Sequence, residues 1–156
     1  MIYPTQAFIK FFKSINGAFS VTEAIALYNI LSEVKEGVYV ELGVAHGKSA
    51  TVAMDILPKG TFHLVDPEFE QMNHIEDVAF KLRMVSMDFL LCFNPMYSTD
   101  FLVKPPGSYD QFSYVMVDSG SHQDGLPLAE VKLLEDRMIE GGIMAFHDYQ
   151  SQFSEV

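Results

Sequence analysis

The sequence has no apolar run long enough to suggest a membrane segment. Its longest apolar stretches are short, such as residues 89–93, whereas a membrane-spanning helix needs about 18 or more apolar residues in a row. Residues 1–4 lack the basic start and apolar core of a secretory signal peptide. Cys92 is the only cysteine, which excludes an internal disulfide framework. We therefore expect no membrane association and a cytoplasmic location.

Basic residues are also scarce. The chain has 10 Lys and Arg against 21 Asp and Glu, a formal net charge of −11. Non-specific affinity for nucleic acids depends on Lys and Arg side chains that neutralise phosphates, and Lys10 and Lys13 stand outside any basic cluster. We therefore expect no nucleic-acid partner. The sequence leaves open whether copies of the chain form a homo-oligomer.

Apolar residues are plentiful, and their pattern alternates between strands and helices. With 156 residues, of which 49% are hydrophobic, the chain is expected to form one domain, with N-terminal helices over 1–37 and a core over 38–149. One helix is expected to begin at Thr22 as N-cap, and another to span 127–139. Strand patterns occur near residues 38–42, 62–66, 90–97, 112–118 and 142–147.

This alternation predicts an α/β fold. Continuously apolar strands separated by helices favour a Rossmann-like, doubly wound and mostly parallel sheet with helices on both faces. We expect the first strand to be central. In such a sheet, ligands bind outside the carboxyl ends of the strands.

A glycine loop follows the first predicted strand. Residues 38–42 end in an acid and a leucine, and Gly43 and Gly47 enclose three residues before a predicted helix. A dinucleotide loop requires G-x-G-x-x-G, and a phosphate-binding P-loop requires four residues between its glycines. Glu41 would repel a triphosphate and suits a ligand with positive charge. A side chain at Gly43 would obstruct the close approach of such a ligand.

Carboxylates occur at the ends of four of the five predicted strands, at Glu41, Asp66, Asp118 and Asp148. Asp66 lies about twenty residues after the loop, where an acid binds a ribose diol in dinucleotide folds. Glu41 and Asp66 also have a purely structural interpretation. Glu41 would cap the helix that begins near Gly47, and Asp66 would start a turn with the following proline.

The loop resembles motif I of the class I S-adenosylmethionine-dependent methyltransferases. Residues 114–122, with Asp118 and His122, and residues 141–149, with a Gly-Gly turn and His147-Asp148, resemble the region of strands 4 and 5 in small-molecule O-methyltransferases, including those that act on sugars. The resemblance spans roughly residues 38–149. In that family the fold usually continues past the fifth strand through a helix and two further strands, which would be missing here.

The resemblance implies a role for each matching position. His122 would be the general base, with Asp118 and Asp148 as further catalytic residues. A divalent cation such as Mg²⁺ would be held by Asp118, His147 and Asp148, although Ser119 replaces an acid that often binds this metal, which weakens the case. The residues that would bind S-adenosylmethionine are Glu41, Gly43, Val44, Ala45, Gly47, Ser49, Asp66 and Asp118.

These roles imply methyl transfer from S-adenosylmethionine to a small-molecule acceptor, with a hydroxyl as the expected target. Two alternatives stay open. A methyltransferase-like domain without catalytic activity would bind a small molecule or a partner, which fits the altered Ser119. A nicotinamide-dependent oxidoreductase is disfavoured by the three-residue gap between Gly43 and Gly47.

Overall fold

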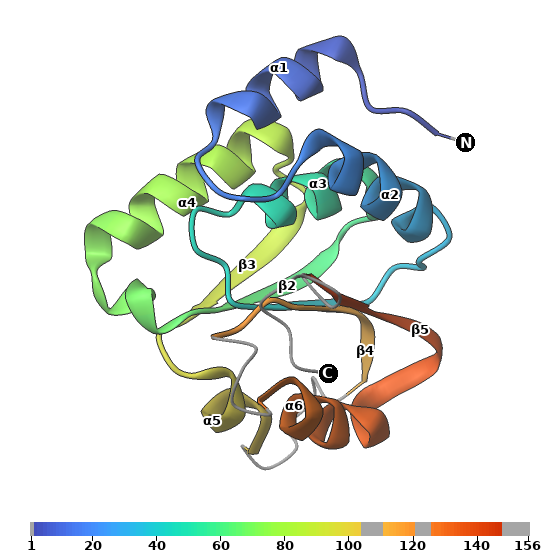
Figure 1. Cartoon of the computed structure of the whole chain (residues 1–156), viewed down its shortest axis with the longest axis vertical. Helices are drawn as coiled ribbons and strands as arrows, with labels where there is room; N and C mark the ends of the chain where they lie inside the picture. The colour runs from blue at the N-terminus through green and yellow to red at the C-terminus, as the bar shows by residue number, and fades with distance from the viewer. Residues whose placement is uncertain (1, 104–110, 121–125, 148–156) are drawn as a thin grey trace.

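Helices and strands alternate along the chain as the sequence pattern predicts (Figure 1). The computed structural model describes residues 2–103, 111–120 and 126–147. No helix in these ranges is both long enough and apolar enough to span a membrane. The strands are β1 (Val38–Leu42), β2 (Gly60–Val65), β3 (Phe89–Asn94), β4 (Phe112–Val117) and β5 (Met138–Phe146). The α-helices are α1 (Gln6–Ser14), α2 (Val21–Leu31), α3 (Lys48–Ile56), α4 (Met72–Val85), α5 (Ser98–Val103) and α6 (Leu126–Leu134).

The strands form one sheet in the order β3-β2-β1-β4-β5. All four pairings are parallel, and β1 is central between β2 and β4. The Rossmann-like fold and the central first strand are therefore confirmed. The chain moves outward from β1 to β3 and then crosses back to β4. This reversal creates a switch point at the carboxyl ends of β1 and β4, where open α/β sheets bind their ligands.

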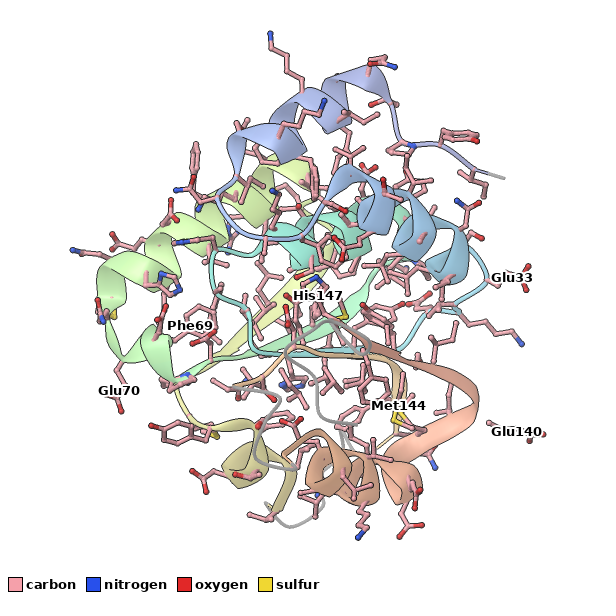
Figure 2. All side chains as sticks on the ribbon, viewed as in Figure 1. Glu33, Phe69, Glu70, Glu140, Met144 and His147 are labelled. Atoms are coloured by element: carbon pink, nitrogen blue, oxygen red, sulfur yellow. The ribbon has the colours of Figure 1, made fainter. Side chains whose placement is uncertain are left out.

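Helices cover both faces of the sheet. Helices α1 to α4 lie on one face, and α5 and α6 lie on the other (Figure 1). Alternate strand residues enter the two cores, so that Tyr39 packs toward the first group of helices and Val40 toward the second. Figure 2 shows the resulting distribution, with Glu33 and Glu140 at the periphery and Phe69 and His147 directed inward.

Helix α2 begins two residues earlier than the sequence suggested. Ser20, not Thr22, is its N-cap. The Ser20 hydroxyl accepts a hydrogen bond from the Glu23 amide at 3.2 Å, and the Glu23 carboxylate accepts one from the Ser20 amide at 2.6 Å. This reciprocal capping box satisfies two amides that a helix start otherwise leaves without partners, and it fixes the orientation of Glu23.

The segment before β5 differs from its prediction. Helix α6 ends at Leu134, a short 3-10 helix, η2 (Glu135–Arg137), follows, and the strand begins at Met138 instead of near residue 142. The pairing of β5 with β4 shifts between Phe112 and Tyr114, and Gly141 lies in this irregular part with φ 79°. Gly141 and Gly142 therefore lie in a bulge inside the strand, where the sequence suggested a Gly-Gly turn after the helix. Helix α5 had no predicted counterpart.

Candidate functional site

The glycine loop joins the carboxyl end of β1 to α3 through a sharp turn. Gly43, Ala45 and Gly47 have φ values of 83°, 43° and 74°. The left-handed region suits glycine, whereas Ala45 occupies it at an energetic cost. Gly47 is the N-cap of α3, and its amide donates to the carbonyl of Val44 at 2.8 Å. The loop thus has a fixed and partly strained shape.

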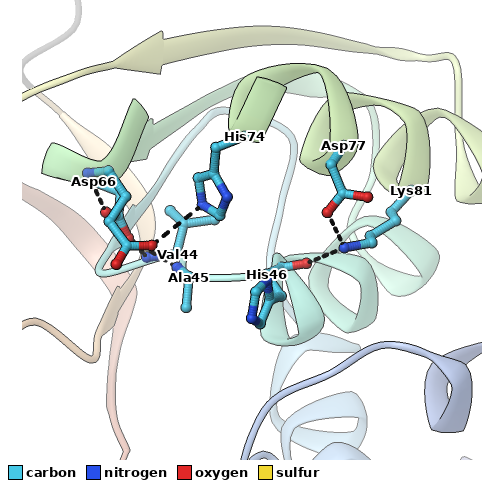
Figure 3. A network of polar contacts seen from close by, with 8 residues as sticks. Val44, Ala45, His46, Asp66, His74, Asp77 and Lys81 are labelled. Carbon is cyan, nitrogen blue, oxygen red and sulfur yellow. Dashed lines mark hydrogen bonds and ion pairs between the residues drawn. The ribbon is translucent and has the colours of Figure 1, made fainter. Parts of the chain in front are cut away.

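Asp66 holds this loop from the end of β2 (Figure 3). Its Oδ2 accepts hydrogen bonds from the amides of Val44 and Ala45, each at 2.8 Å. Its Oδ1 accepts a third, also at 2.8 Å, from the amide of Glu68 in the 3-10 helix η1 (Pro67–Glu70). Asp66 therefore fixes Ala45 in its left-handed conformation.

Helix α4 supports the outer side of the loop (Figure 3). The Lys81 ammonium donates to the carbonyl of His46 at 3.5 Å and forms an ion pair with Asp77. The imidazole rings of His46 and His74 lie 6.0 Å apart between centroids, and Nε2 of His74 lies 3.7 Å from the Glu68 carboxylate. The loop is thus held between the end of β2 and the surface of α4.

Glu41 lies beneath the loop with its side chain fully buried. Its Oε1 accepts a hydrogen bond from the Ser49 hydroxyl of α3 at 2.7 Å. Burial raises the pKa of Glu41 to about 8, although the hydrogen bond from Ser49 acts in the opposite direction. The negative charges of Asp118 and Asp66 contribute to the increase.

The end of β4 packs directly against the glycine loop. The amide of Asp118 donates to the carbonyl of Leu42 at 2.8 Å. A Cβ atom added to Gly43 would lie 2.2 Å from the carbonyl oxygen of Asp118 and 2.9 Å from Cα of Ser119. The Ser119 hydroxyl in turn donates to the buried Glu130 carboxylate of α6. Contacts within the protein thus favour glycine at position 43.

His147 links the sheet edge to helix α2. It follows β5 and packs against the ring of Phe19, with 5.0 Å between ring centroids. Its Nδ1 lies 3.1 Å from Oδ1 of Asp118, and its Nε2 lies 3.2 Å from Oε1 of Glu23. Burial alone would raise the pKa of Glu23, but hydrogen bonds from Ser20 and the charge of His147 lower it.

Two cavities flank the loop. The larger, of about 400 Å³, lies over the ends of β1, β2 and β4, and its lining includes Gly43, Asp66, Tyr97, Ser98 and Gly120. The smaller, of about 270 Å³, lies between the loop and the segment that joins α1 to α2, and its lining includes Phe19 and His147. Ala45 and Asp118 line both cavities. Two small molecules, one in each cavity, could therefore meet beside Ala45 and Asp118.

Most of the predicted site residues lie at one edge of the sheet, but they do not all line the same cavity. Gly43, Ala45, Asp66 and Asp118 line the larger cavity, and Val44, Ala45, Ser49 and Asp118 line the smaller. Glu41 and Gly47 lie under and at the end of the loop and line neither cavity. The predicted residues His122 and Asp148 lie outside the described residues.

Other lining residues had no signal in the sequence. Phe19 and Lys48 are examples, since the Lys48 ammonium donates to the carbonyl of Gly17 at 3.1 Å and lies 4.8 Å from the ring centroid of Phe12. These contacts depend on how α1 and α3 pack together. Tertiary packing, which no local pattern reveals, brings them to the site.

The cavities fit S-adenosylmethionine better than they fit a metal ion. The larger cavity combines a loop position without a side chain at Gly43 with the carboxylates of Asp66 and Asp118, which suits a cationic nucleoside. Among the residues that the structure describes, no three His, Cys, Asp or Glu side chains form a group that could hold a metal ion. Both ring nitrogens of His147 already face carboxylates. The expected Mg²⁺ site is therefore not supported.

Comparison with known proteins identifies the same architecture. A family described as a methyltransferase domain matches residues 40–149. The fold resembles an O-methyltransferase from Streptomyces achromogenes, TomG, solved in complex with S-adenosylmethionine (16% identity, TM-score 0.65, 94% of this chain and 66% of that one). It also resembles an S-adenosylmethionine-dependent O-methyltransferase from Thermotoga maritima (13% identity, TM-score 0.65, 92% of this chain and 49% of that one).

The range of similar folds is wider than one acceptor class. An rRNA methylase from Streptococcus thermophilus shares 16% identity at a TM-score of 0.57, with 82% of this chain and 72% of that one covered. No curated protein matches the chain. The chain spans 66% and 49% of the lengths of the two O-methyltransferases. At these identities the likeness establishes the fold and leaves the acceptor to be argued from the site.

Proposed function

Since the chain belongs to the methyltransferase domain family, we propose that it transfers a methyl group from S-adenosylmethionine to a hydroxyl of a small-molecule acceptor. Family membership confirms the resemblance to class I S-adenosylmethionine-dependent methyltransferases. The hydroxyl target and the small-molecule class belong to the proposal. The single observation that carries it is the pair of cavities that meet at Ala45 and Asp118 beside the glycine loop.

The larger cavity would take the cofactor. Its volume of about 400 Å³ falls within the range of roughly 300–1,000 Å³ that small-molecule sites occupy. The backbone at Gly43 would contact the cofactor directly, while Asp66 would hold the loop amides and accept a ribose hydroxyl at Oδ1. The cofactor would supply a methyl group on a sulfonium, which needs no further activation by the protein.

The smaller cavity would take the acceptor. Phe19 and His147 form one wall, and Asp118 stands at the boundary with the larger cavity. The main task of these residues would be to align the acceptor oxygen with the methyl group, because proximity and orientation supply much of the acceleration in such a displacement. The volume of about 270 Å³ suits a small molecule, and the net charge of −11 disfavours a nucleic-acid acceptor.

A hydroxyl acceptor must also lose its proton. We assign this step to His122, on the strength of its family position, with Asp118 and Asp148 as supporting carboxylates. We expect that His122→Ala keeps cofactor binding and lowers turnover by roughly 10²–10⁴-fold, the usual range for a general base. Release of S-adenosylhomocysteine with a panel of phenols, catechols and sugars would measure turnover. Turnover that EDTA abolishes and Mg²⁺ restores, with little effect of His122→Ala, would contradict this assignment.

Cofactor binding tests the proposed function most directly. We expect calorimetry to show saturable binding of S-adenosylmethionine and S-adenosylhomocysteine and none of NAD, because the Gly43–Gly47 spacing departs from the dinucleotide pattern. Binding of NAD alone would favour an oxidoreductase, and binding of none of the three would remove the basis of the proposal. Cofactor binding without any methylated acceptor would favour the non-catalytic alternative.

A further inference from the structure

Two buried polar atoms beneath the glycine loop lack hydrogen-bond partners. Oε2 of Glu41 and the hydroxyl oxygen of Tyr114 are both inaccessible to solvent, and neither has a partner among the residues that the structure describes. Both side chains lie on the face of the sheet that α3 covers, since Glu41 contacts Ser49 of that helix and Tyr114 belongs to the same core. Burial also raises the pKa of Tyr114, to which the charges of Glu41 and Asp118 contribute.

Further acidic groups surround this pair. The carboxylates of Asp66 and Asp118 oppose ionisation of Glu41, and only the Ser49 hydroxyl and the amide of Ala50 stabilise its charged form. A buried carboxylate with so little compensation is costly, and such a group keeps its proton instead. Glu41 is nevertheless close to the site, because it lies two residues before Gly43, which lines the larger cavity.

We infer that Glu41 carries a proton while the loop has no ligand and releases it when a cationic cofactor binds, so that it favours S-adenosylmethionine over S-adenosylhomocysteine. This inference rests on the proposed function. The proton leaves the carboxyl oxygen for solvent, and the carboxylate that remains offsets the positive charge of the ligand. Both ligands carry an ammonium, but only S-adenosylmethionine adds the sulfonium. S-adenosylhomocysteine, which lacks the sulfonium, would therefore displace less of the proton, and its affinity would rise less steeply with pH than that of S-adenosylmethionine.

The first test measures protons released on binding. Calorimetric titration of S-adenosylmethionine at pH 7 in two buffers of different ionisation enthalpy, such as phosphate and Tris, gives this number. We expect wild type to release up to about one proton more than Glu41→Gln, with a smaller difference for S-adenosylhomocysteine. Affinity for S-adenosylmethionine in wild type should rise relative to the variant by up to about tenfold per pH unit below pH 8, the limit for one linked proton.

The variant isolates Glu41 from other titrating groups. Histidines near the loop and the amino group of the ligand, which titrates near pH 8, are present in both proteins and cancel in the difference. Glutamine keeps an acceptor for the Ser49 hydroxyl. Glu33→Gln, at an exposed position, should behave as wild type. Equal proton release by wild type and Glu41→Gln would overturn the inference but not the proposed function, because the cofactor would still bind. Absence of cofactor binding would instead count against the proposed function.

The second test needs no variant for its main result. Infrared difference spectra of wild type should show the carbonyl band of a protonated carboxyl that disappears when S-adenosylmethionine saturates the site, and persistence of the band would overturn the inference.

Without ligand, the folded state holds the Glu41 proton up to about pH 8 and the unfolded state only to about 4.5. Wild type should therefore lose stability relative to Glu41→Gln as pH rises through this window.

Discussion

Gly43→Ala is expected to lower the free energy of unfolding by about 2–5 kcal/mol. Alanine would have to adopt a left-handed backbone conformation, and its Cβ would overpack the site. Gly43 has φ 83°, and its added Cβ would lie 2.2 Å from the carbonyl oxygen of Asp118. That atom belongs to backbone at the end of β4 and cannot rotate away. Thermal or urea unfolding would measure the loss, and calorimetry below the unfolding temperature should show no binding of S-adenosylmethionine.

Gly141 provides a matched control. It has φ 79°, close to that of Gly43, but nothing lies within 4 Å of its added Cβ. Gly141→Ala should therefore lower the free energy of unfolding only by the cost of a left-handed backbone, about 1–2 kcal/mol. Equal losses at the two positions would show that the contact between Gly43 and the end of β4 is unimportant. The sequence suggested that a side chain at Gly43 would disturb only the ligand, and the structure adds the effect on folding.

Replacing Asp66 with asparagine is expected to destabilise the protein by about 1.5–3 kcal/mol, the range for hydrogen bonds to a charged group. The amide keeps one oxygen, so it cannot serve both the Val44 and Ala45 amides and the Glu68 amide on its other side. Asp66→Ala, which serves none of the three, should be worse. Both variants should bind S-adenosylmethionine more weakly, because the loop loses its support.

Asp77→Asn is the matched control for Asp66. Asp77 is a half-exposed acid in an ion pair with Lys81 on the surface of α4, and such pairs contribute about 0–1 kcal/mol. Urea unfolding should therefore place this control near wild type and Asp66→Asn well below it. An Asp66→Asn protein with the stability and cofactor affinity of wild type would refute the role of Asp66 as the support of the loop.

The fold was largely predictable because its strands carry a strong local signal. Strands β1, β2 and β4 are mostly apolar segments that end at Leu42, Val65 and Val117, each followed by a glycine or an acid. The start of β5 was not predictable, because Met138 continues the apolar pattern of the preceding helix. The bulge at Gly141 depends on pairing with β4, which exists only in three dimensions.

The candidate site was predictable in location but not in its contacts. Parallel strands bring their carboxyl ends together, so the meeting of Gly43, Asp66 and Asp118 followed from sequence order. That Asp66 accepts amides of the loop depends on where the turn directs its N–H groups. Glu23 gave no signal, because its contact with His147 requires α2 to pack beside the end of β5.

The hydrogen bonds of Asp66 also bear on which nucleotides the fold can accept. Backbone amides at the turn between a first strand and its helix are the groups with which many α/β proteins bind pyrophosphate. Here the amides of Val44 and Ala45 already face a carboxylate from the chain itself. A dinucleotide or a triphosphate would have to displace this built-in anion, whereas a nucleoside without phosphate would not. Selection against phosphorylated ligands would thus rest on one side chain, that of Asp66, which already occupies the two amides that a phosphate would need.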